Sequence, residues 1–297
     1  MSKSRIEFSG AALKNNVMKQ LLCPFDFSAA AVNAAKYAAH LAQDRNRDLV
    51  LLYVEQVSAW HGVVPEAPGA LPLADDGARG TKEQLQSYAA SLEHEFKIRC
   101  TADLRTYIAT VSDALGKAIS LGDFELIVMG TGGADTEMDH LFGTTTYQVI
   151  RDARKPLLLV PENCRFEKPS RILYATDYCP DDLSHITGLL TLFARYRPEL
   201  TVFHVSKKRT AVSDEVFRCF RNVLEDDLGQ KRNIRFKRAV GDDVPGILTD
   251  VMHDYDLLVL FTRHRNLVSS IFQRRTLRKL SLSPDFPMLV FPYQMDR

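Results

Sequence analysis

The chain has 297 residues, of which 45% are hydrophobic and 25% charged, and 38 Lys and Arg against 37 Asp and Glu give a net charge of +1. This composition is typical of a globular protein long enough for two domains. It lacks the basic excess of a nucleic-acid-binding protein, and no apolar run approaches the roughly 20 residues of a membrane span. Five cysteines without a Cys-x-x-Cys pair favour a cytoplasmic location over a disulfide framework or a zinc site.

The N-terminal part predicts a leader, a strand, a helix and a second strand. Residues 1–18 are expected to be the leader, and an apolar strand follows within 20–28 and ends at Asp26. Ser28 is a candidate N-cap, and the alanine-rich helix after it can pack closely on a sheet because its side chains are small. The second apolar strand is predicted at 49–54.

The segment 56–81 holds four glycines and three prolines, which predict a long loop. It contains Trp60, which either covers a site or is an incidental loop residue. Beyond it, strands are predicted at 125–130 and 155–161, and between them lies a glycine-rich connection, GTGGADTEMDHLFGTTT, over 130–146. Glycine tolerates positive φ and lets the backbone approach a ligand, so this strand-to-helix connection can wrap phosphate groups.

The second half of the chain repeats the first. Strands at 171–179 and 200–205 match the first two at an offset of 151, and strands at 256–261 and 286–292 match the next two at an offset of 131. Asp177 stands in place of Asp26, whereas Phe261, His264 and Gln273 stand in place of Gly130, Gly133 and Gly143. The bulky Phe261 is expected to obstruct phosphate, so the sequence predicts one nucleotide site, in the first half.

Strands that alternate with helices, and apolar runs such as 157–160, predict a doubly wound parallel α/β sheet in each half. We expect domain 1 over 19–163 and domain 2 over 164–297. Residues 1–164 carry 16 basic and 20 acidic side chains, a net −4, and residues 165–297 carry 22 and 17, a net +5. Opposite charges favour association of the two halves, or of two copies of the chain.

Ligands of open parallel sheets bind beyond the carboxyl ends of the strands, where the winding direction reverses. Asp26 and the Gly130 loop are expected to face each other across a crevice at that point, with Asp26 suited to the adenosine end of a nucleotide. The backbone N–H groups of Gly143, Thr144 and Thr145 would begin a helix, whose dipole and unpaired donors favour phosphate. The two threonine hydroxyls could bind phosphate or magnesium.

These residues resemble the ATP-binding members of the universal stress protein family, over residues 19–293. The family pattern Gly-x2-Gly-x9-Gly-[Ser/Thr] is matched by Gly130, Gly133, Gly143 and Thr144, and a Pro-x-Asp-Phe-Ser-like segment by Pro24, Asp26, Phe27 and Ser28. The resemblance implies that Val54 lines the adenine pocket and that the backbone of Met129 and Gly130 contacts the nucleotide. The predicted binding residues are Asp26, Val54, Met129, Gly130, Gly133, Gly143, Thr144 and Thr145.

The resemblance also implies an architecture. Each half would be a five-stranded parallel-sheet domain of the adenine-nucleotide alpha-hydrolase-like type. The two tandem domains would pair through their last strands, LLLVP and MLVFP, as an internal pseudo-dimer. A further homodimer is compatible with this arrangement.

The glycine loop departs from the family pattern in its charge. Asp135, Glu137 and Asp139 lie in it, and the nearest downstream basic residue is Arg151, whereas family members often carry a basic residue within the loop. A carboxylate near polyphosphate repels it unless magnesium intervenes or the side chain points into solvent. Weaker affinity, or a preference for a less charged nucleotide such as AMP, stays open.

The sequence shows no phosphate loop of the Gly-x4-Gly-Lys-[Ser/Thr] type, no nucleophile elbow and no metal-ligand spacing, so we predict no catalytic or metal-binding residue. The first hypothesis is a cytoplasmic stress-response protein that binds ATP or AMP, with magnesium, in domain 1. It would regulate an unidentified protein partner and would contact neither nucleic acid nor membrane. The alternatives are a slow ATPase or nucleotide hydrolase, with water oriented by Thr144, Asp26 or His140, and a nucleotide-free scaffold.

Overall fold

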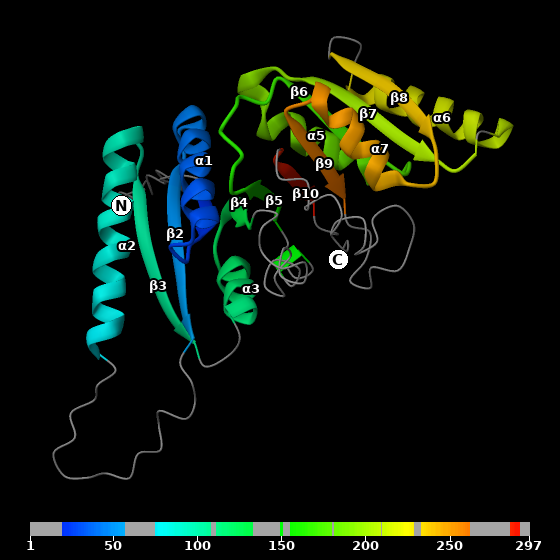
Figure 1. The fold of residues 1–297 in the computed structure, drawn as a ribbon. Coiled ribbons are helices and arrows are strands. Elements are labelled where there is room, and N and C mark those ends of the chain that lie inside the picture. Colours follow the sequence, from blue (N-terminus) through cyan, green and yellow to red (C-terminus); the bar gives the residue numbers. More distant parts are fainter. Residues whose placement is uncertain are drawn as a thin grey trace, which may run out of the picture.

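The fold was analysed in a computed structural model, which describes residues 20–56, 75–107, 111–132, 149–150, 155–179, 181–208, 210–228, 233–261 and 286–291. The predicted leader, residues 1–18, lies outside these ranges. Figure 1 shows the two halves of the chain as successive α/β units joined near the middle of the molecule. Within the ranges described, no helix is both long and apolar enough to cross a lipid bilayer.

The first half alternates strands and helices. Its elements are β1 (Gln20–Pro24), α1 (Ala29–Arg45), β2 (Asp48–Gln56), α2 (Asp75–Phe96), β3 (Cys100–Tyr107), α3 (Val111–Leu121), β4 (Phe124–Thr131) and β5 (Leu157–Pro161). The second half repeats this order. Its elements are β6 (Arg171–Ala175), α5 (Asp182–Leu192), η2 (Ala194–Tyr196), β7 (Glu199–Ser206), α6 (Ala211–Leu228), β8 (Ile234–Val240), α7 (Val244–Val251), η3 (Met252–Asp254), β9 (Leu257–Phe261) and β10 (Met288–Phe291).

The described strands form one ten-stranded sheet in the order β3-β2-β1-β4-β5-β10-β9-β6-β7-β8. Neighbouring strands within each half are parallel. The halves meet where β5 and β10 pair antiparallel, with Leu158 opposite Leu289. Two doubly wound five-stranded halves, joined through their last strands, are the predicted fold class, which is thereby confirmed.

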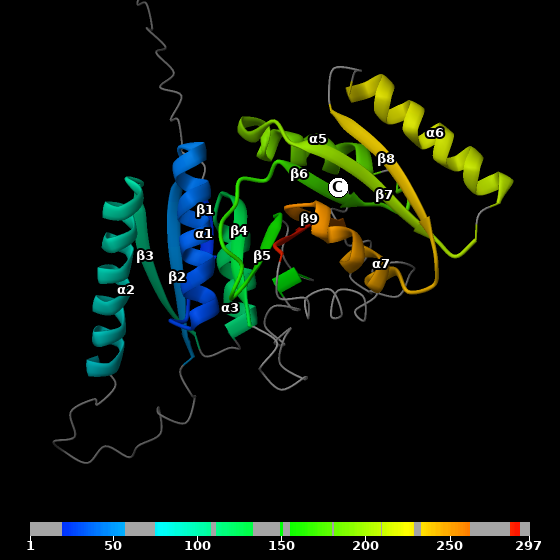
Figure 2. The ribbon, with the colours of Figure 1, turned by 45° about the horizontal axis from the view of Figure 1, so that its top comes forward.

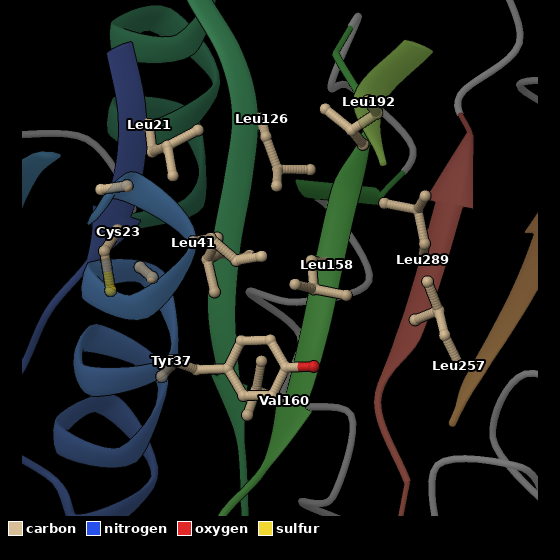
Figure 3. Packing of buried hydrophobic residues seen from close by; sticks show 14 of the residues in the cluster. Leu21, Cys23, Tyr37, Leu41, Leu126, Leu158, Val160, Leu192, Leu257 and Leu289 are labelled. Atoms are coloured by element: carbon tan, nitrogen blue, oxygen red, sulfur yellow. The ribbon is translucent and has the colours of Figure 1, made fainter. Parts of the chain in front are cut away.

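The helix α1 begins as predicted and packs closely on the sheet. Its N-cap is Ser28, whose Oγ accepts a hydrogen bond from the Ala31 N–H at 3.2 Å. The alanines on its inner face are fully buried, which brings the helix close to β4 and β5. Figure 3 shows Tyr37 and Leu41 of α1 directed at these strands, in a hydrophobic cluster that continues across the β5–β10 pairing to Leu289.

The same helix also contacts the segment that joins the halves, and the second half itself. The Asn33 side-chain N–H group donates to the carbonyl oxygens of Pro161 and Cys164, each at 2.8 Å. Near the C-terminal end of α1, Asp44 accepts a hydrogen bond from the Tyr196 hydroxyl at 3.0 Å. Contacts from α1 therefore reach both the connection after β5 and the η2 turn of the second half.

Both ends of the loop predicted over 56–81 belong to regular elements in the structure. Gln56 ends β2, and residues 75–81 form the first turns of α2, so the prediction was wrong at both ends. The helix contains two glycines, each costing about 1 kcal/mol relative to alanine, and buries Leu85 and other apolar side chains further along. Residues 57–74, with Trp60, lie outside the described residues.

Candidate functional site

The described site residues gather at the carboxyl-terminal edge of three neighbouring strands. Because β1 is parallel to both β2 and β4 and lies between them, the ends of these strands meet at one edge, where the winding reverses. Asp26 lies in the turn after β1, Val54 lies near the end of β2, and Met129 and Gly130 lie near the end of β4. The structure therefore brings these four predicted residues to the same edge.

The turn that carries Asp26 is shaped by the aspartate itself. Its Oδ1 accepts a hydrogen bond from the Ser28 N–H at 3.0 Å, which closes an Asx turn. Phe27, between them, has a left-handed backbone with φ of 64°. Asp26 is exposed, and among the described residues this N–H is its one hydrogen-bond donor. The second carboxylate oxygen is therefore available to a ligand.

Val54 and Met129 supply apolar surface beside this carboxylate. Both side chains are half-buried, and both pack against the hydrophobic cluster on the face of the sheet that α3 covers. Since β1 separates their two strands, they flank the end of β1 on this face. A flat apolar group placed beyond β1 could contact both of them.

Gly130 permits a close approach of β4 to the first turn of α1. A Cβ atom at this position would lie 2.3 Å from the carbonyl oxygen of Ala30 and 2.9 Å from the backbone nitrogen of Ala31. Both neighbours are helix backbone, so no side-chain rotation could relieve the clash. The resemblance implies a nucleotide contact for this residue, and the packing against α1 is a further reason for a glycine that sequence reasoning missed.

The remaining predicted binding residues, Gly133, Gly143, Thr144 and Thr145, lie outside the described residues, as do His140 and the three acidic residues of the loop. Their phosphate-binding role stays a prediction. Among the residues that are described, no group of three or more His, Cys, Asp or Glu side chains could hold a metal ion.

In the second half, aromatic side chains fill the corresponding place. Phe261, the counterpart of Gly130, is 2% exposed, and its ring centroid lies 4.3 Å from that of His185 on α5. The helix α5 begins at Asp182, five residues after Asp177, whereas α1 begins three residues after the equivalent Asp26. Phe261 is therefore part of a packed core contact, and its obstruction of phosphate stays a prediction.

A buried polar network holds the β6–α5 turn of the second half. Asp182 is 1% exposed, and its carboxylate accepts hydrogen bonds from the Tyr174 hydroxyl at 2.7 Å, the Cys179 N–H at 2.9 Å and the Thr176 hydroxyl. Burial raises the pKa of Asp182, and these hydrogen bonds oppose that shift in part. The first half has apolar or small residues at the positions equivalent to Tyr174, Thr176 and Asp182, namely Cys23, Phe25 and Ala31. The two turns are therefore built differently.

The fold and this edge together define a doubly wound α/β protein whose candidate ligand site lies at the switch point of its first half. Residues 18–161 match the family model described as the universal stress protein family. This match covers just under half of the chain and makes its first half similar to that family.

Individual proteins are also similar to this chain. Universal stress protein MJ0531 of Methanocaldococcus jannaschii is 23% identical over 145 residues, which cover 49% of this chain and 83% of that protein. Universal stress protein Slr1230 of Synechocystis is 26% identical over 181 residues, with 54% and 60% covered. A universal stress protein structure from Archaeoglobus fulgidus covers 92% of this chain and 98% of its own, with a TM-score of 0.68 at 16% identity. That structure shares the fold of both halves.

Proposed function

We propose that the first half of this protein binds an adenine nucleotide beyond the ends of β1, β2 and β4, and that the protein is a cytoplasmic regulatory module of the stress response. The observation that carries the proposal is the exposed Asp26 carboxylate, which lies at the same edge as the half-buried Val54 and Met129 and keeps one oxygen without a donor among the described residues. Adenine requires this combination of a hydrogen-bond acceptor for its amino group and apolar surface for its ring faces.

The phosphates would extend from this pocket along β4 toward the glycine-rich connection. Gly133, Gly143, Thr144 and Thr145 would then supply backbone N–H groups and hydroxyls, as the motif implies. The acidic loop makes magnesium important for a triphosphate, because the metal ion would neutralise charge between phosphate and carboxylate. With AMP, which carries less charge, affinity would depend less on magnesium.

The second half would serve as a nucleotide-free counterpart of the first. We propose that residues 164–297 form a second universal stress domain whose site has been lost. The repeated strand order and the buried Phe261 support this assignment. A protein partner would then respond only to whether the first half holds a nucleotide.

Calorimetric titration with ATP and with AMP, each with and without magnesium, tests the proposal. We expect about one nucleotide per chain. Asp26→Ala should weaken binding roughly tenfold, since one lost hydrogen bond of about 1.4 kcal/mol gives that factor. Asp177→Ala, the matched change in the second half, should leave affinity unchanged.

Gly133→Val separates the phosphate cradle from the adenosine pocket. It should abolish ATP binding while circular dichroism shows an intact fold. Retained ATP affinity would place the phosphates elsewhere, and no binding of either nucleotide at millimolar concentration to the wild type would refute the proposal. Phosphate release that Asp26→Ala abolishes would favour a slow nucleotide hydrolase over a binding module.

A further inference from the structure

The two outer strands of the sheet differ in their charge. Among the described residues, β3 pairs with β2 alone and β8 with β7 alone, so each presents a row of unpaired backbone groups. Natural proteins protect such edges with charged side chains, lysine above all, or with proline. The seven residues of β8 include three basic side chains, Arg235, Lys237 and Arg238. The eight residues of β3, CTADLRTY, carry one acidic and one basic side chain and have no proline. The β3 edge therefore lacks the protection that β8 has.

The backbone of β3 can accept another strand at defined positions. The Leu49 N–H donates to the Arg99 carbonyl oxygen at 2.9 Å, and β2 and β3 stay in register from Leu49 opposite Cys100 onward. In a parallel pair, alternate residues direct both backbone groups to the neighbouring strand. The odd-numbered residues of β3 therefore face β2, and the even-numbered residues Ala102, Leu104 and Thr106 direct their N–H and C=O groups outward.

We propose that β3 pairs antiparallel with β3 of a second copy of this chain, about a two-fold axis at Leu104, to form a homodimer. Leu104 of each copy would exchange two backbone hydrogen bonds with its equivalent, and Ala102 would pair with Thr106. Asp103 would then stand directly opposite Arg105 of the second copy, in the closer, non-hydrogen-bonded type of pair.

Charge complementarity selects this register over its neighbours. With the axis at Ala102, Arg105 would face Arg99 of the second copy. With the axis at Asp103 or at Arg105, the residue on the axis would face the same residue of the second copy. Like charges in directly opposite positions destabilise a strand pair. In the single chain, Asp103 and Arg105 already form an ion pair at 2.8 Å, with about a third of each side chain exposed. The dimer would extend this pair into a network of four alternating charges.

The middle of the helix α2, which covers β3, lies at the same height along the strand direction as the proposed two-fold axis. A strand rises about 3.3 Å per residue and a helix about 1.5 Å. The four residues from Cys100 to Leu104 therefore span the same height as about nine residues of α2, counted back from its end at Phe96. By this count the axis at Leu104 passes close to Ser87, near the middle of the helix.

Two exposed side chains of opposite charge on α2 would approach each other across this two-fold axis, one from each copy of the chain. Tyr88 marks the flank that faces α1, because its hydroxyl donates to the Val32 carbonyl oxygen at 3.5 Å. At about 100° per residue, Lys82 and Glu93 lie on the opposite flank, toward the free edge, and both are exposed. They are nearly equidistant from Ser87, so Lys82 of one copy would approach Glu93 of the other. The strand and the helix thus favour the same symmetric contact.

The test combines charge reversal with a mixing experiment, read by sedimentation velocity over a range of protein concentrations. The wild type is expected to dimerise. Asp103→Arg and Arg105→Asp each place like charges opposite one another in two places, and each should weaken the dimer roughly tenfold or more. An equimolar mixture of the two variants should dimerise again, since every pair is then oppositely charged. The intrachain Asp103–Arg105 pair stays broken in the mixture, so its loss cannot produce the recovery.

Lys237→Glu on β8 is the matched control and should leave the dimer unchanged. Thermal melts of each variant establish that the fold is intact. A wild type that is monomeric at all concentrations would overturn the proposal. So would single variants that dimerise like the wild type, or a mixture that stays monomeric. The measurement needs no nucleotide, so its outcome is independent of the proposed ligand.

Discussion

Gly130 has a packing role in addition to the ligand contact proposed for it. Its missing Cβ lets β4 approach the backbone of α1 at Ala30, next to the turn that holds Asp26. A ligand that contacts Gly130 therefore lies against a place where strand and helix are already in tight contact. The geometry of Asp26 depends on that contact, because Ser28 both caps α1 and donates to Asp26.

Gly130→Ala tests this contact. We expect it to lower the free energy of unfolding by about 1–3 kcal/mol, the usual cost of an overpacked site. Gly80→Ala in α2 is the control, since a Cβ there meets no atom within 4 Å and alanine favours a helix by about 1 kcal/mol. Urea denaturation of both variants gives the comparison. Similar stability changes in both would show that β4 and α1 are not tightly packed at Gly130.

Some site residues could be predicted from the sequence and others could not. Asp26 and Ser28 are local signals, because an aspartate after an apolar strand and a serine before a helix have meaning within a few residues. The packing role of Gly130 depends on a distance to Ala30, a hundred residues away in the chain. The small residues that open α1 were the available signal, but they do not specify which strand approaches them.

Among the elements, the turns after β1 and β6 show how duplicated segments diverge. The first turn leaves its aspartate exposed, whereas the second binds Asp182 in a buried network. We expect Tyr174→Phe to destabilise the protein by about 1–3 kcal/mol, because a buried carboxylate would lose a donor. Tyr88→Phe, whose hydroxyl makes a long 3.5 Å bond at a partly exposed site, should cost less. Denaturant titration of the two variants measures the difference, and equal losses would contradict it.

The entry to β6 gives a prediction of pH dependence. Partial burial raises the pKa of Asp256, but hydrogen bonds from Ser170 and Arg171 outweigh this effect and lower it below its usual value of 3.8. The unfolded chain therefore binds a proton more readily, so the stabilisation is present at neutral pH and is lost as the pH falls below 3.8. Asp256→Asn should cost about 1–2 kcal/mol near neutral pH and progressively less in acid. A cost that does not change with pH would contradict this role.

The start of α2 shows where prediction of elements fails. Glycines and prolines mark a loop well, yet the last part of 56–81 is helical. Local composition underestimates a helix whose later turns are held by burial, because the cost of two glycines is small beside the burial of several apolar side chains. The strands were predicted more reliably, since uninterrupted apolar runs are typical of strands covered on both faces.

At the scale of the whole molecule, the β5–β10 pairing makes one sheet of two halves, as Figure 2 also shows. The repeat in the sequence predicts two similar units but not how they meet. Any of the strand edges could have joined them, and the antiparallel contact through the last strands was expected from the family resemblance alone.

This joint predicts cooperative unfolding. Leu289 is fully buried opposite Leu158 in a cluster that contains residues of both halves. Leu289→Ala should lower the free energy of unfolding by about 2–5 kcal/mol and should weaken both halves together. Hydrogen exchange of β1 and β6 amides reports each half separately. Faster exchange in β6 alone would show that the halves unfold independently.

The helix α1 connects the turn of the candidate site in the first half to the second half of the molecule. Its first residue follows the Asp26 turn, its second turn is bonded to the carbonyl groups of Pro161 and Cys164, and its last turn is bonded to Tyr196. A helix of 17 residues is a stiff rod about 25 Å long. A ligand that tilts its N-terminal end therefore displaces its other end against the second half. If the first half binds a nucleotide as proposed, the second half would in this way respond to whether that site is occupied.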